Sequence, residues 1–250
     1  MLELNKIYNM DCLEGLKQLD NDCVDLVVTS PPYNMGGTML PGPSALGKRK
    51  EISYDDKLTS NEYFDFLHKV INELFRVTKS YIFFNIQPLS GNKGVIWKLF
   101  GEYNEEIKEV IIWHKKRAPP HPSKFVLRHN YEFIIVFDKK HPKKRSYLGL
   151  NNPTESTCWD GEPNDLFYRD RFNADGLGAI FPLWIPVRVI NGFTKEGDLI
   201  LDPFIGSGTT AVACKQLHRR FIGFEISPDY CSIAQKRLDN TVISKRLGDI

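Results

Sequence analysis

The chain has 250 residues, of which 42% are hydrophobic and 26% are charged, and its formal net charge at pH 7 is +2. This composition is typical of a globular protein of one or two domains and excludes a disordered chain. The net charge is too small to indicate a nucleic-acid ligand, so any such prediction depends on where the basic residues lie.

The first part of the chain shows apolar runs at strand and helix spacing. Thr59 and Glu62 form the pattern of a capping box, which predicts the start of a long helix. In chain order we predict a strand over residues 5–11, a helix over 12–19, a strand over 24–28, a helix over 60–77 and a central strand over 81–85.

The remaining elements alternate between helix and strand patterns. We predict a helix over residues 95–100, strands over 109–114 and 131–137 that pair as neighbours, a helix over 186–193, a strand over 199–201, a helix ending near 217, a strand over 221–225 and a helix over 228–238. Two stretches show no periodicity. Residues 35–57 are predicted to be a mobile loop, and residues 138–180 a candidate target-recognition insertion.

Cysteine and histidine spacing gives no indication of a disulfide or metal framework. The five cysteines are an odd number, widely spaced, with no Cys-x-x-Cys pair, which favours reduced, buried thiols in a cytoplasmic protein. The histidines have no partner cysteines nearby, so no metal site is predicted. Neither a leader segment nor an apolar run long enough to cross a bilayer is seen, and no membrane partner is expected.

The stretch Thr29–Asn34, with sequence TSPPYN, follows the apolar strand of residues 24–28. Consecutive prolines fix two φ angles and push the residues before them into extended conformations. The hydroxyl of Ser30, the carbonyls of Ser30 and Pro31 and the ring of Tyr33 would then form a rigid edge of acceptors suited to a planar amino group. The alternative is a Pro-Pro turn after a core strand.

A second loop, Asp202–Thr210, follows the predicted strand of residues 199–201 and contains two glycines that let the backbone approach a ligand. The next strand ends in Glu225, a carboxylate suited to a ribose diol. A nicotinamide dinucleotide also fits the glycine spacing. Asp202 favours S-adenosylmethionine, because a carboxylate there would repel a pyrophosphate and attract an amino-acid ammonium. The Lys-Ser or Lys-Thr pair of a P-loop does not follow the glycines.

A single helix is predicted after Glu225, so the rest of the sheet must come from residues before the glycine loop. The chain resembles the amino-directed DNA methyltransferases of the β arrangement, in which the catalytic motif precedes the cofactor motif. The resemblance rests on Thr29–Asn34, Asp202–Thr210, Glu225, the run Asn9–Cys12 and the run Asn130–Phe133. It departs at Phe181–Pro182, where the family often has a His-Pro pair.

The resemblance implies an α/β fold: a single Rossmann-like methyltransferase domain over residues 1–250, with a mostly parallel central sheet flanked by helices and a circularly permuted order. It also implies site residues. Catalysis is assigned to Ser30, Pro31, Pro32 and Tyr33, and binding of S-adenosyl-L-methionine to Asp11, Cys12, Ser30, Pro31, Asp202, Pro203, Phe204, Gly206, Ser207, Gly208, Thr209, Thr210 and Glu225.

The implied reaction is direct methyl transfer to cytosine N4 in double-stranded DNA after base flipping, with Tyr33 stacked on the base. Ser30 at the first motif position favours cytosine N4, whereas adenine N6 and a structured RNA remain alternatives, as does a module that binds nucleic acid without catalysis. The argument uses only the ring face of Tyr33, so Tyr33→Phe is expected to keep most activity. Asp11 could instead be a helix cap.

Basic clusters, each of which could also be a solvated surface, are predicted to contact the DNA backbone. They are Lys48, Arg49, Lys50, Lys115, Lys116, Arg117, Lys143, Lys144 and Arg145. A cognate restriction endonuclease and a second copy of the chain in a homodimer are candidate partners. The recognition sequence does not follow from the residues.

Overall fold

The computed structural model describes residues 2–34, 57–116, 130–143, 156–161 and 181–242. These residues form one eight-stranded sheet with strand order β1-β8-β7-β2-β3-β5-β4-β6. Of the described strands, β5 alone runs antiparallel to its neighbours. The mostly parallel sheet that the sequence predicted is therefore confirmed.

The strands and helices agree with the predicted ones to within a few residues. The strands are β1 (Lys6–Asn9), β2 (Val24–Thr29), β3 (Thr78–Ile86), β4 (Ile107–Lys115), β5 (Tyr131–Asp138), β6 (Cys158–Gly161), β7 (Leu199–Asp202) and β8 (Arg220–Glu225). The helices are α1 (Cys12–Leu16), α2 (Ser60–Val77), α3 (Lys93–Glu102), α4 (Trp184–Phe193), α5 (Thr209–Gln216) and α6 (Pro228–Asn240). The predicted capping box of α2 is formed by Thr59 and Glu62.

Two expectations were wrong. Strand β6 lies inside residues 138–180, where no element was predicted, because four residues with one buried side chain leave too short a pattern to read. The cysteines are not uniformly buried, since Cys158 is exposed and Cys23 and Cys231 are only partly buried.

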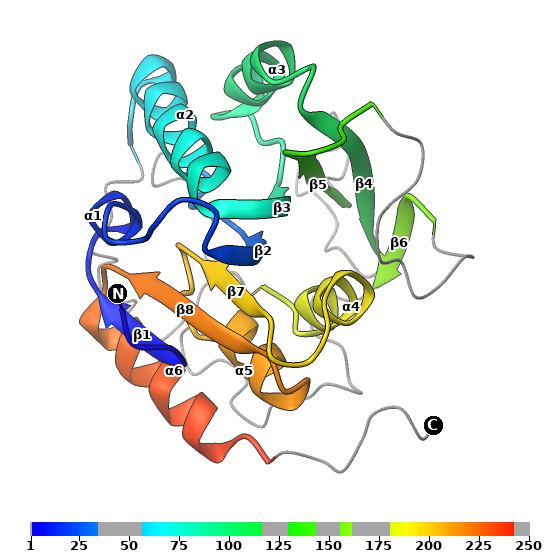
Figure 1. Ribbon diagram of the computed structural model, residues 1–250. Coiled ribbons are helices and arrows are strands. Elements are labelled where there is room, and N and C mark those ends of the chain that lie inside the picture. Colours follow the sequence, from blue (N-terminus) through cyan, green and yellow to red (C-terminus); the bar gives the residue numbers. More distant parts are fainter. Residues whose placement is uncertain (1, 35–56, 117–129, 144–155, 162–180, 243–250) are drawn as a thin grey trace.

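Helices cover both faces of the sheet. Figure 1 shows α1, α2 and α3 on one face and α4, α5 and α6 on the other. Alternate residues of a strand serve the two cores: Val27 packs with the first group of helices, whereas Leu26 and Val28 pack with the second. Strand β2 is buried on both sides for this reason, so the loop that follows it is held by a rigid support.

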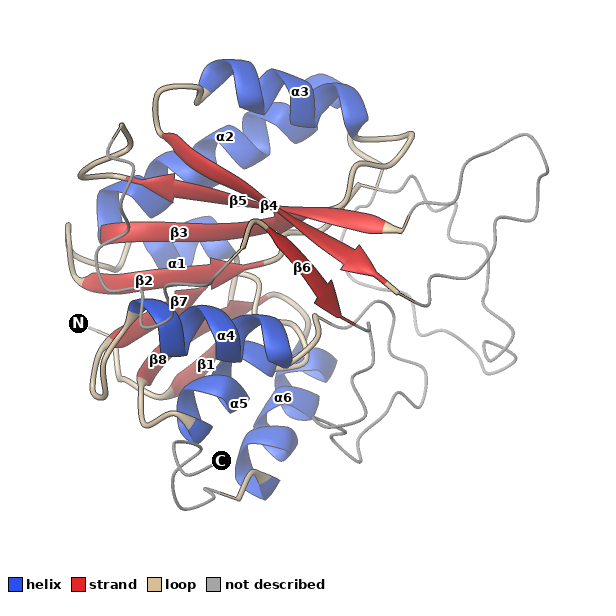
Figure 2. Ribbon diagram, turned by 90° about the vertical axis from the view of Figure 1, so that its right-hand side faces the viewer, coloured by secondary structure: helices blue, strands red, loops and turns tan. Residues whose placement is uncertain are grey.

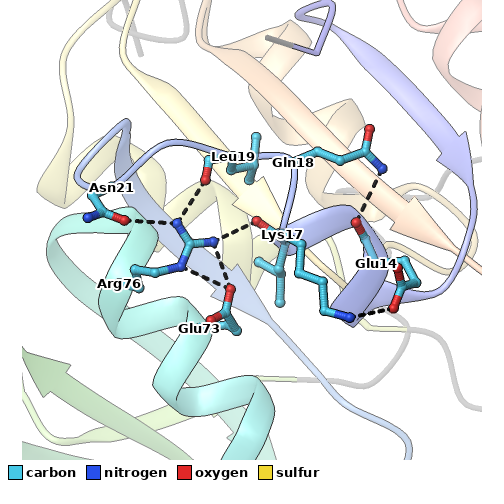
Figure 3. Close-up of polar contacts among 8 residues, drawn as sticks. Glu14, Lys17, Gln18, Leu19, Asn21, Glu73 and Arg76 are labelled. Carbon is cyan, nitrogen blue, oxygen red and sulfur yellow. Dashed lines mark hydrogen bonds and ion pairs between the residues drawn. The ribbon is translucent and has the colours of Figure 1, made fainter.

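Arg76, near the end of α2, joins this helix to the amino-terminal segment. Its guanidinium donates to the carbonyls of Leu16 and Leu19, at 2.8 Å each, and to Glu73 at 2.7 Å, as Figure 3 shows. The last carbonyls of a short helix need such donors. Helix α1 is thereby fixed beside the strands of the site.

The order of the strands brings distant segments together. Strands β7 and β8, late in the chain, lie between β1 and β2, as Figure 1 shows with β7 in yellow and β8 in orange between the two blue strands. The carboxyl ends of β1, β8, β7, β2 and β3 therefore meet at one edge of the sheet, because these strands are parallel. Figure 2 shows β2 and β3 side by side within the stack of strands.

Candidate functional site

The loop after β2 is held by donors from neighbouring elements. The hydroxyl of Tyr63 in α2 donates to the carbonyl of Pro32 at 2.7 Å, and Nδ2 of Asn92 donates to the carbonyl of Tyr33 at 2.8 Å. The carbonyl of Pro31 accepts no hydrogen bond from the described parts of the chain. The two occupied carbonyls, of Pro32 and Tyr33, are not among the acceptors that the sequence predicted for a ligand.

Asn34 ends the described part of this loop in a left-handed conformation, with φ at 53°. Its side chain accepts from the backbone N–H of Leu58 at 2.9 Å and donates to the carbonyl of the same residue at 2.8 Å. This paired contact mimics the pairing between two strands. It ties the loop to the residue that precedes the cap of α2.

Polar side chains from four segments meet beside Ser30. The hydroxyl of Tyr33 lies 3.0 Å from Oγ of Ser30, 2.7 Å from Oε2 of Glu132 in β5 and 2.7 Å from Nδ2 of Asn85 in β3. Nδ2 of Asn85 also lies 2.6 Å from Oε2 of Glu132. Lys115, at the end of β4, forms an ion pair with the other oxygen of this carboxylate. We call these five side chains the Ser30 network.

The inner members of the Ser30 network are buried, since Asn85 is 1% exposed and Glu132 is 5% exposed, whereas Ser30, Tyr33 and Lys115 are partly buried. Burial and the charge of Glu132 raise the pKa of Tyr33 well above its ordinary value, so the phenol keeps its proton. The sequence analysis missed Asn85 as a site residue and used Glu132 only as part of a family motif. The available signal was a polar residue at the end of an otherwise apolar strand.

Lys115 does not have the exposed position expected of a residue that contacts DNA. Its side chain is 14% exposed and its charge is balanced by Glu132, so it faces the Ser30 network instead of standing free on the surface. A run of basic residues gives no indication of this difference. The pairing of β4 with β5 places His114 beside Tyr131, and this register brings the next residue of β4, Lys115, close to Glu132 of β5.

Asp202 lies at the end of β7, directly beside β2. Its Oδ1 accepts from the hydroxyl of Thr29 at 2.7 Å and from the N–H of Phe204 at 3.1 Å, and its Oδ2 accepts from the hydroxyl of Thr210 at 2.6 Å. Burial raises the pKa of Asp202 to about 6, although these hydrogen bonds oppose the shift. Asp202 therefore connects the two predicted motifs of the chain.

The glycines of the second loop have positive φ angles, 50° at Gly206 and 85° at Gly208. A Cβ atom at Gly208 would lie only 2.8 Å from the Cβ of Ala234 in α6. Glycine is needed there for the backbone angle and for the close approach of the helix. Gly206 donates its N–H to Oε2 of Glu225 at 3.1 Å, so the loop and the end of β8 are joined.

Arg237 in α6 supports the same loop from behind. It is 6% exposed, and one guanidinium nitrogen lies 2.6 Å from both the carbonyl and the hydroxyl oxygen of Ser207 and 3.2 Å from the hydroxyl of Thr209. The sequence analysis did not identify Arg237. A single arginine in a polar helix carries no signal of such a contact.

At the end of β8, Glu225 accepts one backbone hydrogen bond on each carboxylate oxygen, from Gly206 and, at 2.8 Å, from Ser227. Burial raises the pKa of Glu225 above its ordinary value. Asn9, at the end of β1, donates to the carbonyl of Glu225 at 2.9 Å. The sheet therefore places the ends of β1 and β8 together.

Asp11 caps α1, because its Oδ1 accepts from the N–H groups of Leu13 at 2.8 Å and Glu14 at 3.2 Å. The helix-cap role that the sequence left open is thus present. The neighbouring Cys12 is buried, and burial raises the pKa of its thiol to about 12. A thiol in this state is neutral and packs as an apolar group.

The other predicted site residues are divided between described and undescribed parts of the chain. Pro203 is buried and Phe204 is partly buried beside Asp202. Lys116 is exposed, and Lys143 pairs with Glu105 on the surface. Outside the described residues lie Lys48, Arg49, Lys50, Arg117, Lys144 and Arg145, together with most of residues 35–57 and 138–180. Among the described residues, no helix is long and apolar enough to span a membrane.

The chain is similar to curated type II methyltransferases over most of its length. It is 30% identical over 246 residues to M2.DpnII of Streptococcus pneumoniae, covering 93% of this chain and 89% of that protein. It is 29% identical over 249 residues to M.HpaI of Haemophilus parainfluenzae, covering 92% of this chain and 73% of that protein.

Two solved structures share the fold. The PvuII DNA methyltransferase, described as cytosine-N4-specific, is 21% identical with a TM-score of 0.69 and covers 95% of this chain and 87% of its own. TTHA0409 of Thermus thermophilus, a putative DNA modification methylase in complex with S-adenosyl-L-methionine, is 23% identical with a TM-score of 0.65 and covers 96% of this chain and 95% of its own.

A family model described as DNA methylase, for the N6/N4 methyltransferases, matches residues 24–236. This range is well over half of the 250-residue chain and contains both loops and the Ser30 network. The predicted cofactor agrees with the dependence of this family on S-adenosyl-L-methionine. The chain therefore belongs to the family of amino-directed DNA methyltransferases, which modify cytosine N4 or adenine N6.

Proposed function

We propose that this chain transfers the methyl group of S-adenosyl-L-methionine to the exocyclic N4 of cytosine in duplex DNA. The observation that supports this is the position of Ser30. It follows directly on Thr29, whose hydroxyl is bonded at 2.7 Å to Asp202 of the glycine-containing loop. An acceptor for the target amine and a loop suited to the methyl donor thus stand at adjacent strand ends.

In this proposal the cofactor lies along the ends of β7, β8 and β1. Each carboxylate oxygen of Glu225 holds one backbone N–H and keeps a lone pair for a ribose hydroxyl. Asp202 would attract the ammonium of the methionine part, and the carboxylate of Asp11 would serve the adenine ring. Gly206 and Gly208 keep the loop backbone open to the ligand.

The chemical step is a direct displacement. The lone pair of an exocyclic amine is delocalised into the ring, and hydrogen bonds from its two protons to Oγ of Ser30 and the carbonyl of Pro31 localise it. The nitrogen then forms a bond to the methyl carbon while the carbon–sulfur bond breaks. The bonding electron pair would stay on sulfur as a neutral thioether, and the methylated amine would carry the positive charge and release one proton to solvent.

The choice of cytosine over adenine rests on Ser30 at the first position of the motif. The similar PvuII enzyme, whose name states cytosine-N4 specificity, supports this choice. The same acceptors would also hold the amine of adenine, so the product must be identified by experiment. A structured RNA is a less favoured substrate.

Duplex DNA hides the amine, so the base must leave the helix, and stacking on Tyr33 offsets part of the cost. Lys116 and Lys143 are surface cations suited to phosphates, together with the basic residues outside the described ranges. We keep one domain, a homodimer and a cognate restriction endonuclease as proposals. Residues 138–180 are proposed to read the target sequence.

The test is the identity of the modified base. DNA from a host without endogenous amino-methylation that expresses this chain would be digested to nucleosides and analysed by mass spectrometry. We expect N4-methylcytosine with the parent chain and a much lower amount with Ser30→Ala at an equal level of expression. N6-methyladenine alone would overturn the cytosine assignment and keep the amine chemistry. Neither base in the DNA would overturn both.

A further inference from the structure

Counting the protons in the Ser30 network shows which group donates in each of its hydrogen bonds. The carboxylate of Glu132 has only acceptors and a phenol has one proton, so the contact of 2.7 Å commits the proton of Tyr33 to Glu132. Nδ2 of Asn85 has only protons to give, so it donates to the oxygen of Tyr33 at 2.7 Å. The opposite orientation of the Asn85 amide would place its oxygen 2.6 Å from a carboxylate oxygen, which is repulsive.

With its proton committed, Tyr33 presents only a lone pair to Ser30. The contact of 3.0 Å between the two hydroxyls therefore has Ser30 as the donor. Oγ of Ser30 then has only lone pairs left, one toward Nδ2 of Asn85 in a long contact of 3.4 Å and the other for a ligand. This matters for catalysis, because a hydroxyl that donated toward the amine would compete for the lone pair that must attack the methyl group.

The negative charge of Glu132 keeps Tyr33 as the donor to Glu132 and Ser30 as the donor to Tyr33. A protonated carboxyl could donate to Tyr33 and reverse the chain of hydrogen bonds. Lys115 contacts the second oxygen of Glu132 and balances its charge in a site where the two side chains are 14% and 6% exposed. The raised pKa of Tyr33 also keeps the phenol as a donor over the physiological range.

We propose that Glu132 is a positioning residue which acts through the Tyr33 hydroxyl to hold Oγ of Ser30 as a hydrogen-bond acceptor for the target amine. This inference rests on the proposed methyl transfer. It assigns a role to a residue whose side chain contacts Tyr33, Asn85 and Lys115. It also gives Lys115 a function inside the site, as the counter-charge of Glu132.

The experiment is a cycle of variants read by single-turnover methyl transfer to duplex DNA at saturating cofactor. Glu132→Gln and Tyr33→Phe should each lower the rate about 10-fold, because each frees the Ser30 hydroxyl to turn. The double variant should be no slower than Tyr33→Phe alone, since the short path from Glu132 to Ser30 runs through that hydroxyl, whereas the path through Nδ2 of Asn85 reaches Oγ of Ser30 only at 3.4 Å. Cofactor affinity should stay at the parent value in all three.

Two variants control for charge and folding. Glu132→Gln with Lys115→Met removes both members of the ion pair, so it should fold and match the rate of Glu132→Gln alone. Glu109→Gln alters a carboxylate of β4 that accepts from the backbone N–H of Val110 and is not a member of the Ser30 network. This variant should leave the rate unchanged. Parallel loss of cofactor affinity and rate in Glu132→Gln would show a structural role and overturn the proposal.

The outcomes separate this inference from the proposed function. If the parent chain methylates cytosine but the two single effects multiply in the double variant, Glu132 does not act through Tyr33 and the inference fails alone. If the parent methylates adenine and the effects do not multiply, the network is supported while the cytosine assignment fails.

Discussion

The two ends of the site differ in how far along the chain their contacts reach. At the cofactor end, Asp202 is bonded to groups 2 and 8 residues away and Glu225 to groups 2 and 19 residues away, and the bond of Asp202 to Thr29 spans 173 residues. At the catalytic end, Tyr33 is bonded to Ser30, 3 residues away, and to groups 52 and 99 residues away. Most of these side-chain bonds at the first end are therefore short in sequence, whereas most at the second end depend on the order of strands in the sheet.

This difference predicts which property each substitution should change. Removing one member of the cofactor end should weaken a local contact and leave the chemistry intact. Changing one member of the catalytic end should alter a hydroxyl that the substituted residue does not itself touch. In the Ser30 network, which group donates in one hydrogen bond fixes which group donates in the next. Thr29, bonded to Asp202, is the point where the two ends meet.

The largest expected effect separates the ends most clearly. Ser30→Ala removes the acceptor for the target amine and should lower the single-turnover rate about 100-fold, as for the loss of one oriented group in other active sites. Calorimetric titration should give an unchanged cofactor affinity. A rate near that of the parent would mean that the loop is only a turn and that the chemistry lies elsewhere.

A second test uses the raised pKa of Asp202, about 6 against an ordinary value of 3.8. Between these values the folded state binds more protons than the unfolded state, so the free energy of unfolding should fall as pH rises from about 4 to about 6. Relative to Asp202→Asn, the parent should lose on the order of 3 kcal/mol across this range. Denaturant titrations of both proteins at several pH values measure the difference, and parallel curves would contradict it.

The cofactor end itself is tested by Glu225→Ala. This substitution removes a charge-assisted contact and should weaken S-adenosylmethionine binding about 10-fold. The rate at saturating cofactor should remain close to that of the parent, in contrast to Ser30→Ala. Asp202→Ala should show the same loss of affinity together with a lower thermal midpoint, because this residue also bonds Thr29. Unchanged titrations of both variants would remove the cofactor assignment.

The smallest effect compares two adjacent lysines. Lys116 is exposed, so Lys116→Met should reduce the dependence of DNA affinity on log salt by about one phosphate contact. Lys115 is paired with Glu132, so Lys115→Met should leave this slope unchanged. Binding titrations over a range of salt concentrations decide the matter. Equal changes in both variants would mean that Lys115 also reaches the DNA backbone.

The sequence alone determined most elements and both loops. Capping residues, apolar periodicity and the Pro-Pro and glycine signals act over a few residues, so Thr59, Ser30 and Gly208 could be assigned from their neighbours. The family followed from the order of the two motifs, and the family model that matches residues 24–236 agrees.

The tertiary structure alone decided which side chains meet. The sequence argument gave Tyr33 only a ring face, and it placed Lys115 on DNA. The contacts of Tyr33 with Asn85 and Glu132 instead give its hydroxyl a role, so activity after Tyr33→Phe is no longer expected to remain near normal. Together with the ion pair of Lys115, these contacts join strands β3, β4 and β5 to the loop after β2. No rule of local spacing predicts them, because strand order depends on packing of the whole sheet.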